Sequence, residues 1–250
     1  DGSGTTMPRK WIDTMAGLGV WSAELSPYVK MLLSEVLAEG MFGGPGSLPT
    51  RNYITVEAIK AAYAGTRGGA SMDIPEHVKG LLASLQSDSF GDHPLKLAAI
   101  THSEPNAGSD AANIKVTAEL SADGSHYTFN GTKAWCTAFR LADGLLVTAR
   151  TDQKSSGAKG VSLFWVPKES GAIEVRGEGK DGGTCTGKKE HLICYRGMGG
   201  TYEVSFQNFR LDAKWLIGRA GEGWAPMVQR GFASGRLQTA ARSVGLAQTA

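Results

Sequence analysis

The sequence predicts an α+β protein with an N-terminal helical domain, a middle antiparallel β-barrel domain and a C-terminal helical segment. In the first 94 residues apolar side chains recur at helical spacing, and between 95 and about 211 they alternate with polar ones. Helical spacing returns from about residue 221. Several short strands separated by turn residues favour a small antiparallel barrel or sandwich. We therefore divide the chain into residues 1–94, 95–215 and 216–250.

Four segments of the N-terminal region are expected to be helical: residues 11–18, 28–39, 51–64 and 73–86. Ser26 and Pro27 indicate a helix start, because serine caps the free amides and proline is tolerated in the first turn. Asp73, with Pro75 behind it, plays the same part for the last of these helices.

The middle region is expected to form short strands at residues 114–120, 127–129, 132–139, 145–149, 161–166, 172–175, 191–195 and 202–206. Asn130-Gly131 predicts a hairpin turn between two of them, because this dipeptide suits the left-handed turn that joins antiparallel strands. The GxGxxG match at residues 177–182 is not followed by a helix, so we interpret it as an exposed hairpin, not a dinucleotide-binding loop.

The C-terminal segment is predicted to form an amphipathic helix from about residue 222. Its apolar face carries Trp224, Met227, Val228 and Leu237. Nothing in the sequence supplies a surface for this face. We therefore expect a protein partner or a second copy of the chain to cover residues 224–250.

Composition excludes several classes of protein. The formal net charge is +2 with mixed signs, which gives no electrostatic reason to expect nucleic-acid binding. No apolar run approaches the length of a membrane span. The 3 cysteines form no CxxC pair, which favours a reducing compartment, and the 5 histidines have no ligand spacing, so no metal site is expected.

The most informative stretch is residues 101–110, Thr-His-Ser-Glu-Pro-Asn-Ala-Gly-Ser-Asp. It gathers hydroxyls, a glycine and backbone amides in a tight turn, which can present hydrogen-bond donors to an electron-rich ring or a carbonyl oxygen. Alone it would be an ordinary turn. Further blocks follow in order at residues 130–137, 149–152, 159–164 and 217–224.

This ordered set resembles the acyl-CoA dehydrogenase family over nearly the whole chain, and within it the 2-methylsuccinyl-CoA dehydrogenases. The resemblance implies a C-terminal four-helix bundle, of which residues 216–250 would be the start, in an oligomer. It also implies FAD as the cofactor and an acyl-CoA as the substrate, which loses a proton from its α-carbon and a hydride from its β-carbon.

The same resemblance places the cofactor-binding residues in two blocks: Ile100, His102, Ser103, Ser109, Trp135 and Thr137. The hydroxyl of Ser103 would meet the pyrimidine edge of the flavin, and Ser109 the pyrophosphate. Trp135 would cover the ring, and Thr137 would face the N5 region. These residue types suit a flat ring with carbonyl and nitrogen acceptors. For His102 a purely structural role is an equal alternative.

Two arginines are the candidate substrate-binding residues. Arg51 lies where the family lines the bottom of the acyl pocket, and a planar guanidinium can bind a free carboxylate bidentately. The alternative is a solvated Arg at a helix start, which the helix dipole disfavours. Arg236 matches a family Arg near the active site, and a salt bridge on the helix face is its alternative.

No catalytic residue is named, because the family's glutamate base is expected beyond residue 250 or at Gly235, which has no side chain. Two hypotheses remain: an FAD-dependent acyl-CoA dehydrogenase that is inactive as this chain alone, or a catalytically silent scaffold subunit of a larger assembly, in which FAD is lost. The expected location is the mitochondrial matrix in a eukaryote or the cytoplasm in a bacterium.

Overall fold

The computed structural model describes residues 47–65, 70–86, 96–191 and 200–233, with five further positions of the last helix, 235, 236, 239, 240 and 243. The helices predicted at residues 11–18 and 28–39 lie outside the described residues. So does almost all of the strand predicted at 191–195. The predicted division into three domains stays a prediction.

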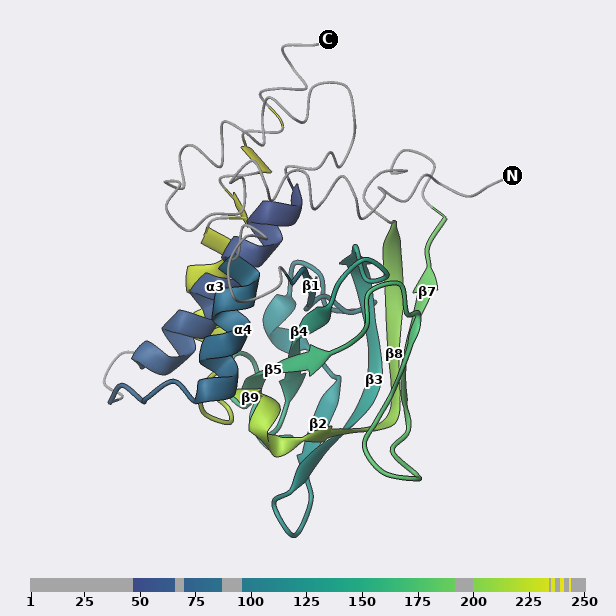
Figure 1. Cartoon of the computed structure of the whole chain (residues 1–250). Coiled ribbons are helices and arrows are strands. Elements are labelled where there is room, and N and C mark those ends of the chain that lie inside the picture. Colours follow the sequence, from purple (N-terminus) through teal and green to yellow (C-terminus); the bar gives the residue numbers. More distant parts are fainter. Residues whose placement is uncertain are drawn as a thin grey trace.

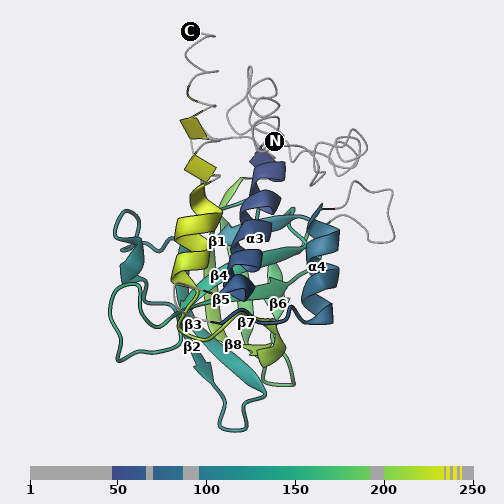
Figure 2. The same ribbon diagram turned by 90° about the vertical axis from the view of Figure 1, so that its left-hand side faces the viewer.

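One sheet of nine strands forms the body of the molecule, in the order β6-β7-β8-β3-β2-β4-β5-β9, with β1 paired to β4. The helices α3 (Ser47–Ala64) and α4 (Glu76–Gln86) pack on one side of it, as Figures 1 and 2 show. Both helices were predicted and are confirmed. The strands are β1 (Ala98–Thr101), β2 (Thr117–Leu120), β3 (His126–Thr137), β4 (Gly144–Arg150), β5 (Val161–Pro167), β6 (Glu174–Arg176), β7 (Thr184–Lys189), β8 (Thr201–Asp212) and β9 (Leu216–Ile217).

The sheet is mixed, so the expectation of a purely antiparallel barrel is wrong, whereas the α+β class is confirmed. Strand β1 runs parallel to β4, with Ala98 opposite Gly144, and β2 meets β4 in parallel at Thr117 and Arg150. The β2–β3 hairpin is inserted in the chain between β1 and β4. Such a long connection lets β4 return in the same direction as β1, which a short turn cannot do.

Asn130-Gly131 does not form the predicted hairpin turn. Strand β3 continues through both residues, and its pairing with β8 shifts register between Phe129 and Gly131. Gly131 has φ 123°, and a Cβ there would lie 3.0 Å from Cγ2 of Val116. The dipeptide therefore accommodates a β-bulge, which needs the same backbone freedom as a tight turn. The turn between β2 and β3 instead contains Gly124, at φ 74°.

The segment with the GxGxxG match connects β6 to β7, and the amide of Gly177 donates to the carbonyl of Gly183 at 3.0 Å. These two strands are antiparallel neighbours. The interpretation of this segment as a hairpin is therefore confirmed.

Both faces of the central strands are covered. All seven residues of β4 are buried. On one face the core is aromatic and includes Phe129, Phe164 and Phe206. On the other face Leu146 and Trp165 pack with residues of α3 and α4. Strand β4, which pairs with β1 beneath the candidate site, is thus held rigidly from both sides.

The last described helix begins at Trp224, close to the predicted start, and residues Ala225–Gly231 are π-helical. It packs along α3, where Gly231 lies against the backbone of Ile54. Within the described part of the chain, no helix is long and apolar enough to cross a membrane. A four-helix bundle is not seen in these residues and stays part of the hypothesis.

Candidate functional site

The predicted turn follows β1 directly and is compact. The amide of Glu104 donates to the carbonyl of Ala107 at 3.1 Å, and that of Ala107 donates back at 3.0 Å. Ser103 is half-buried at the start of this turn, and Ser109 is exposed beyond it. The turn thus presents one hydroxyl beside the sheet and one toward the surface.

Trp135 lies at a second bulge, near the end of β3. The pairing of β3 with β8 shifts register between Lys133 and Cys136, and Trp135 has φ 61°. A left-handed backbone is a genuine outlier for a bulky residue and persists only where the surrounding structure enforces it. The bulge turns the indole outward, so that 58% of Trp135 is exposed. Backbone strain of this kind clusters at active sites and ligand clamps, which makes Trp135 a candidate for such a role.

The turn and the bulge are joined by direct contacts. The amide of Ala134 donates to the carbonyl of Ser103 at 2.8 Å. The Nζ of Lys133 donates to the carbonyl of His102 and to Oε1 of Glu104, both at 2.9 Å. The turn that contains Ser103 and the bulge that contains Trp135 therefore lie side by side.

His102 is a buried neutral residue beneath this site, with 4% of its surface exposed. Its Nδ1 shares a hydrogen bond of 2.7 Å with the hydroxyl of Thr148 on β4. Its Nε2 has no partner among the described residues. The ring contacts Trp224 and Phe232 of the C-terminal helix, with centroids 5.9 Å and 5.3 Å away. Burial, assisted by the charge of Lys133, lowers the pKa of His102 to about 3.

This burial predicts that the protein loses stability in acid. The pKa of His102 is lower in the folded state than in the unfolded state, so its contribution to stability is complete above pH 6.5 and is lost as the pH falls toward 3. The free energy of unfolding should fall by up to about 1.4 kcal/mol per pH unit in this window. Urea titrations at several pH values would measure the slope. The variant His102→Gln should flatten it, and an unchanged slope would show that other groups cause it.

The strain at Trp135 predicts an unusual response to substitution. Trp135→Gly and Trp135→Ala both remove the exposed indole, but only glycine is free of strain at φ 61°. The glycine variant should therefore be more stable than the alanine variant by about 1 kcal/mol. Equal unfolding midpoints in urea would mean that the backbone relaxes in the alanine variant.

Known proteins resemble this chain in sequence and in fold. Residues 99–209 match the family described as "Acyl-CoA dehydrogenase, middle domain". The chain is 30% identical to (2S)-methylsuccinyl-CoA dehydrogenase of Cereibacter sphaeroides over 98% of its own length and 42% of that protein's. The chain belongs to the acyl-CoA dehydrogenase family. It spans less than half of that relative.

Two solved structures of acyl-CoA dehydrogenases share the fold. Butyryl-CoA dehydrogenase from Megasphaera elsdenii superposes with a TM-score of 0.74 and 25% identity, over all of this chain and 60% of that one. A glutaryl-CoA dehydrogenase from Mycobacterium smegmatis in complex with FADH2 has a TM-score of 0.72 and 22% identity, over 98% of this chain and 55% of that one.

The remaining residues predicted to bind cofactor or substrate lie in different elements. Ile100 lies on β1 and Thr137 ends β3, and both are half-buried. Burial raises the pKa of the Cys136 thiol to about 11, and the nearby charge of Arg51 is among the weaker influences that lower it. Arg51 lies on α3. Arg236 is exposed and donates to the carbonyl of Val228 on its own helix at 3.4 Å, and no ion pair of Arg236 is found among the described residues.

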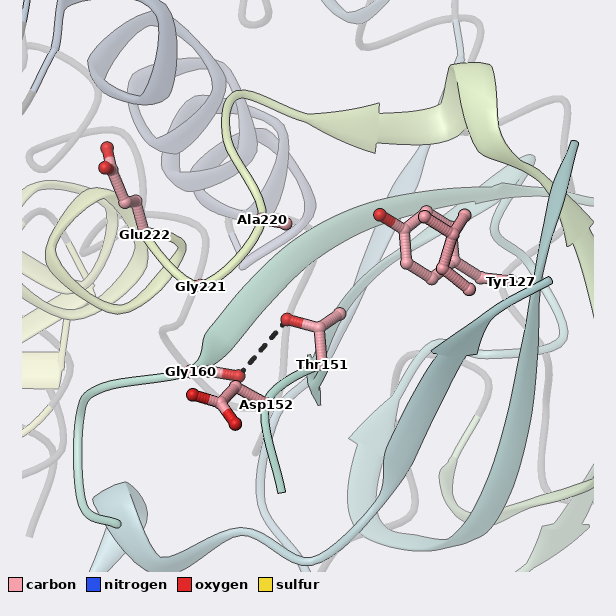
Figure 3. Close-up of a pocket in the computed structure, with 8 residues that line it drawn as sticks. Tyr127, Thr151, Asp152, Gly160, Ala220, Gly221 and Glu222 are labelled. Carbon is pink, nitrogen blue, oxygen red and sulfur yellow. Dashed lines mark hydrogen bonds between the residues drawn. The ribbon is translucent and has the colours of Figure 1, made fainter. Parts of the chain in front are cut away.

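A separate pocket of about 360 Å³ lies near the end of β4 (Figure 3). It contains none of the predicted site residues. Thr151 donates from its hydroxyl to the carbonyl of Gly160 at 3.3 Å, as the dashed line shows. The carboxyl groups of Asp152 and Glu222 also border the pocket. Hydrogen bonds from Ser155 and a backbone amide lower the pKa of Asp152, so this rim is negatively charged at neutral pH.

Sequence reasoning missed the buried charged residues that support the site. Glu104 and Lys133 form an ion pair behind it. Arg150 donates five hydrogen bonds, to the carbonyls of Ala112, Ile114, Ser155, Gly157 and Lys159. The sequence signal for such residues is a charged residue within an otherwise apolar strand. A charged side chain is seldom buried unless it is paired. Among the described residues no group of three or more potential metal-ligating side chains is found.

Proposed function

We propose that this chain is the FAD-binding part of an acyl-CoA dehydrogenase that acts on a short branched or dicarboxylic acyl-CoA. The observation that carries the proposal is the exposed, strained Trp135 held directly beside the Ser103 turn. An exposed indole offers a flat apolar surface to a flavin ring. The related fold of the Mycobacterium smegmatis protein, solved with FADH2, supports the same cofactor.

The residues of this chain fit FAD in type. Ser103 and Thr137 carry hydroxyl donors, Thr137 follows Trp135 by two residues on β3, and Ser109 is exposed, as a hydroxyl that binds a phosphate oxygen must be. When bound, FAD supplies the acceptor for the hydride from the acyl β-carbon. The chain itself orients the ring, donates hydrogen bonds to its polar edge and excludes water from the face beneath the indole.

Arg51 supports the dicarboxylic substrate. It lies on α3 beside Asn52, whose side chain accepts a hydrogen bond from the amide of Ala98 on β1, the strand that leads into the Ser103 turn. A guanidinium at the end of an acyl pocket would hold a free carboxylate through two parallel hydrogen bonds. The relative from Cereibacter sphaeroides is named for methylsuccinyl-CoA, whose acyl group carries such a carboxylate.

One observation favours the alternative of a catalytically silent scaffold subunit. Removal of the α-proton of a thioester needs a positioned base. Gly235, the candidate position for that base, has no side chain, and a Cβ there would meet Cδ1 of Ile54 at 3.0 Å. The described residues therefore supply the cofactor site without an identified base. A carboxylate from a partner chain, or from a second copy that covers the C-terminal helix, would complete the enzyme.

A spectroscopic experiment separates the two functions. FAD titrated into the purified chain should bind, with a shift of its visible absorption bands. Methylsuccinyl-CoA added without oxygen should leave the oxidised-flavin band unchanged, because no base is identified among the described residues. Addition of a partner chain with a glutamate-bearing helical bundle should then bleach it.

The other outcomes of this experiment also distinguish the two functions. Bleaching by this chain alone would contradict the missing base. Absence of FAD binding, with or without the partner chain, would contradict the flavoprotein and favour the scaffold. Butyryl-CoA serves as the control substrate, because its acyl group has no free carboxylate.

A further inference from the structure

An ion pair lies entirely beneath the candidate site. Lys133 is completely buried, and Glu104 is 5% exposed. Their side chains meet at 2.9 Å between Nζ and Oε1. Glu104 also accepts hydrogen bonds from the amides of Lys115 and Val116, and Lys133 also donates to the carbonyl of His102.

Burial of such an ion pair in a core costs free energy. Both charges lose their hydration, and burial lowers the pKa of Lys133 although the carboxylate of Glu104 opposes the shift. Apolar side chains of similar volume often stabilise a protein as well as a buried ion pair does or better. Stability alone therefore gives no reason for charges at these two positions.

The pair lies where it fixes the geometry of the site. Lys133 precedes the bulge that turns Trp135 outward, and His102 and Glu104 flank Ser103. We propose that Lys133 and Glu104 are positioning residues, which hold the Ser103 turn against the Trp135 bulge at the spacing that FAD requires. This inference rests on the proposed function, because it names what sets the shape of that site.

The hydrogen bonds explain why this spacing is rigid. The ammonium has two acceptors, one on each side of Ser103, so the turn cannot slide along β3 without breaking one of them. The carboxylate is held in turn by the backbone amides of Lys115 and Val116, just before β2. Charge-assisted hydrogen bonds are about twice as strong as neutral ones, so the arrangement resists small displacements.

The test compares three variants of the 250-residue chain: Lys133→Met, Glu104→Gln, and the two combined. Each single variant leaves a buried partner and should lower the urea midpoint of unfolding. The double variant should recover most of that loss, because neither charge remains. Its dissociation constant for FAD should nevertheless stay about 10- to 100-fold above that of the wild type, as for other residues that orient ligand contacts.

A matched control is Lys168→Met. Lys168 is another buried lysine, whose Nζ donates to the carbonyls of Ala142 and Glu169 at 2.8 Å. This variant should lose stability without a comparable loss of FAD affinity. Hydrogen exchange of the Ala134 amide, which bonds to Ser103, gives a second readout that needs no cofactor. In the double variant the exchange rate of this amide should rise above its wild-type value, and by more than the rates of the neighbouring amides in β3 do.

Two outcomes would overturn the inference. One is a double variant that binds FAD as tightly as the wild type. The other is unchanged protection of the Ala134 amide in that variant. If the wild type itself binds no FAD, the proposed function fails, and the exchange measurement still decides whether the pair positions the turn.

Discussion

The variant Arg51→Leu is expected to lose most of its affinity for a dicarboxylic acyl-CoA. Truncation of one partner of a close charge pair costs about 2–5 kcal/mol, which is about 30-fold to several thousand-fold in the dissociation constant. Butyryl-CoA should bind almost as well as it does to the wild type, because it has no carboxylate for Arg51. Titration of the FAD-loaded protein with methylsuccinyl-CoA and with butyryl-CoA would measure both constants.

Arg230→Leu provides the matched control. Arg230 lies on the C-terminal helix and lines a separate groove with Glu57 and Lys60 of α3. Its replacement removes the same charge and should affect neither ligand. If Arg51→Leu weakens both ligands equally, Arg51 supports the structure of α3 and does not select the substrate. A selective loss would settle the substrate class independently of turnover.

Local sequence patterns predicted the helices and strands whose formation depends mainly on the residues within them. The helix predicted at residues 51–64 lies within α3, and the strand predicted at residues 145–149 lies within β4, whose continuous apolar run is typical of a strand buried on both faces. The parallel pairing of β1 with β4 joins residues about 46 positions apart. No periodicity within either strand carries that information, because the register depends on how the layers pack.

The same limit applies to the site. Ser103 and Trp135 were predicted from motifs, and the structure places them together. Asn130-Gly131 was misread because a bulge and a hairpin turn demand the same backbone freedom, and only the partner strand β8 distinguishes them. Lys133 and Glu104 carry ordinary charged side chains, whose burial follows from contacts about 29 residues apart. Supporting residues of this kind become visible only in three dimensions.

The variant Asn52→Ala is expected to destabilise the protein by about 3–5 kcal/mol, because it removes a hydrogen-bond partner from two buried and one partly buried backbone group. Asn52 is buried and joins three elements. Its amide nitrogen donates to the carbonyls of Leu85 and Lys96 at 3.0 Å and 2.7 Å, and its carbonyl oxygen accepts from the amide of Ala98 at 2.9 Å. Urea unfolding, with the slope checked for constancy, would measure the loss.

Asn113→Ala is the control, since Asn113 is exposed and its replacement should change stability by less than about 0.5 kcal/mol. A loss below about 1 kcal/mol in Asn52→Ala would mean that water replaces the missing contacts. The variant also reaches the site, because Asn52 fixes α3 against β1 directly beside Arg51 and the turn that begins after Thr101. At a urea concentration where Asn52→Ala is still folded, its affinity for methylsuccinyl-CoA should therefore fall more than its affinity for butyryl-CoA. An equal fall for both ligands would mean that Asn52 maintains the structure of α3 but does not contribute to recognition of the carboxylate.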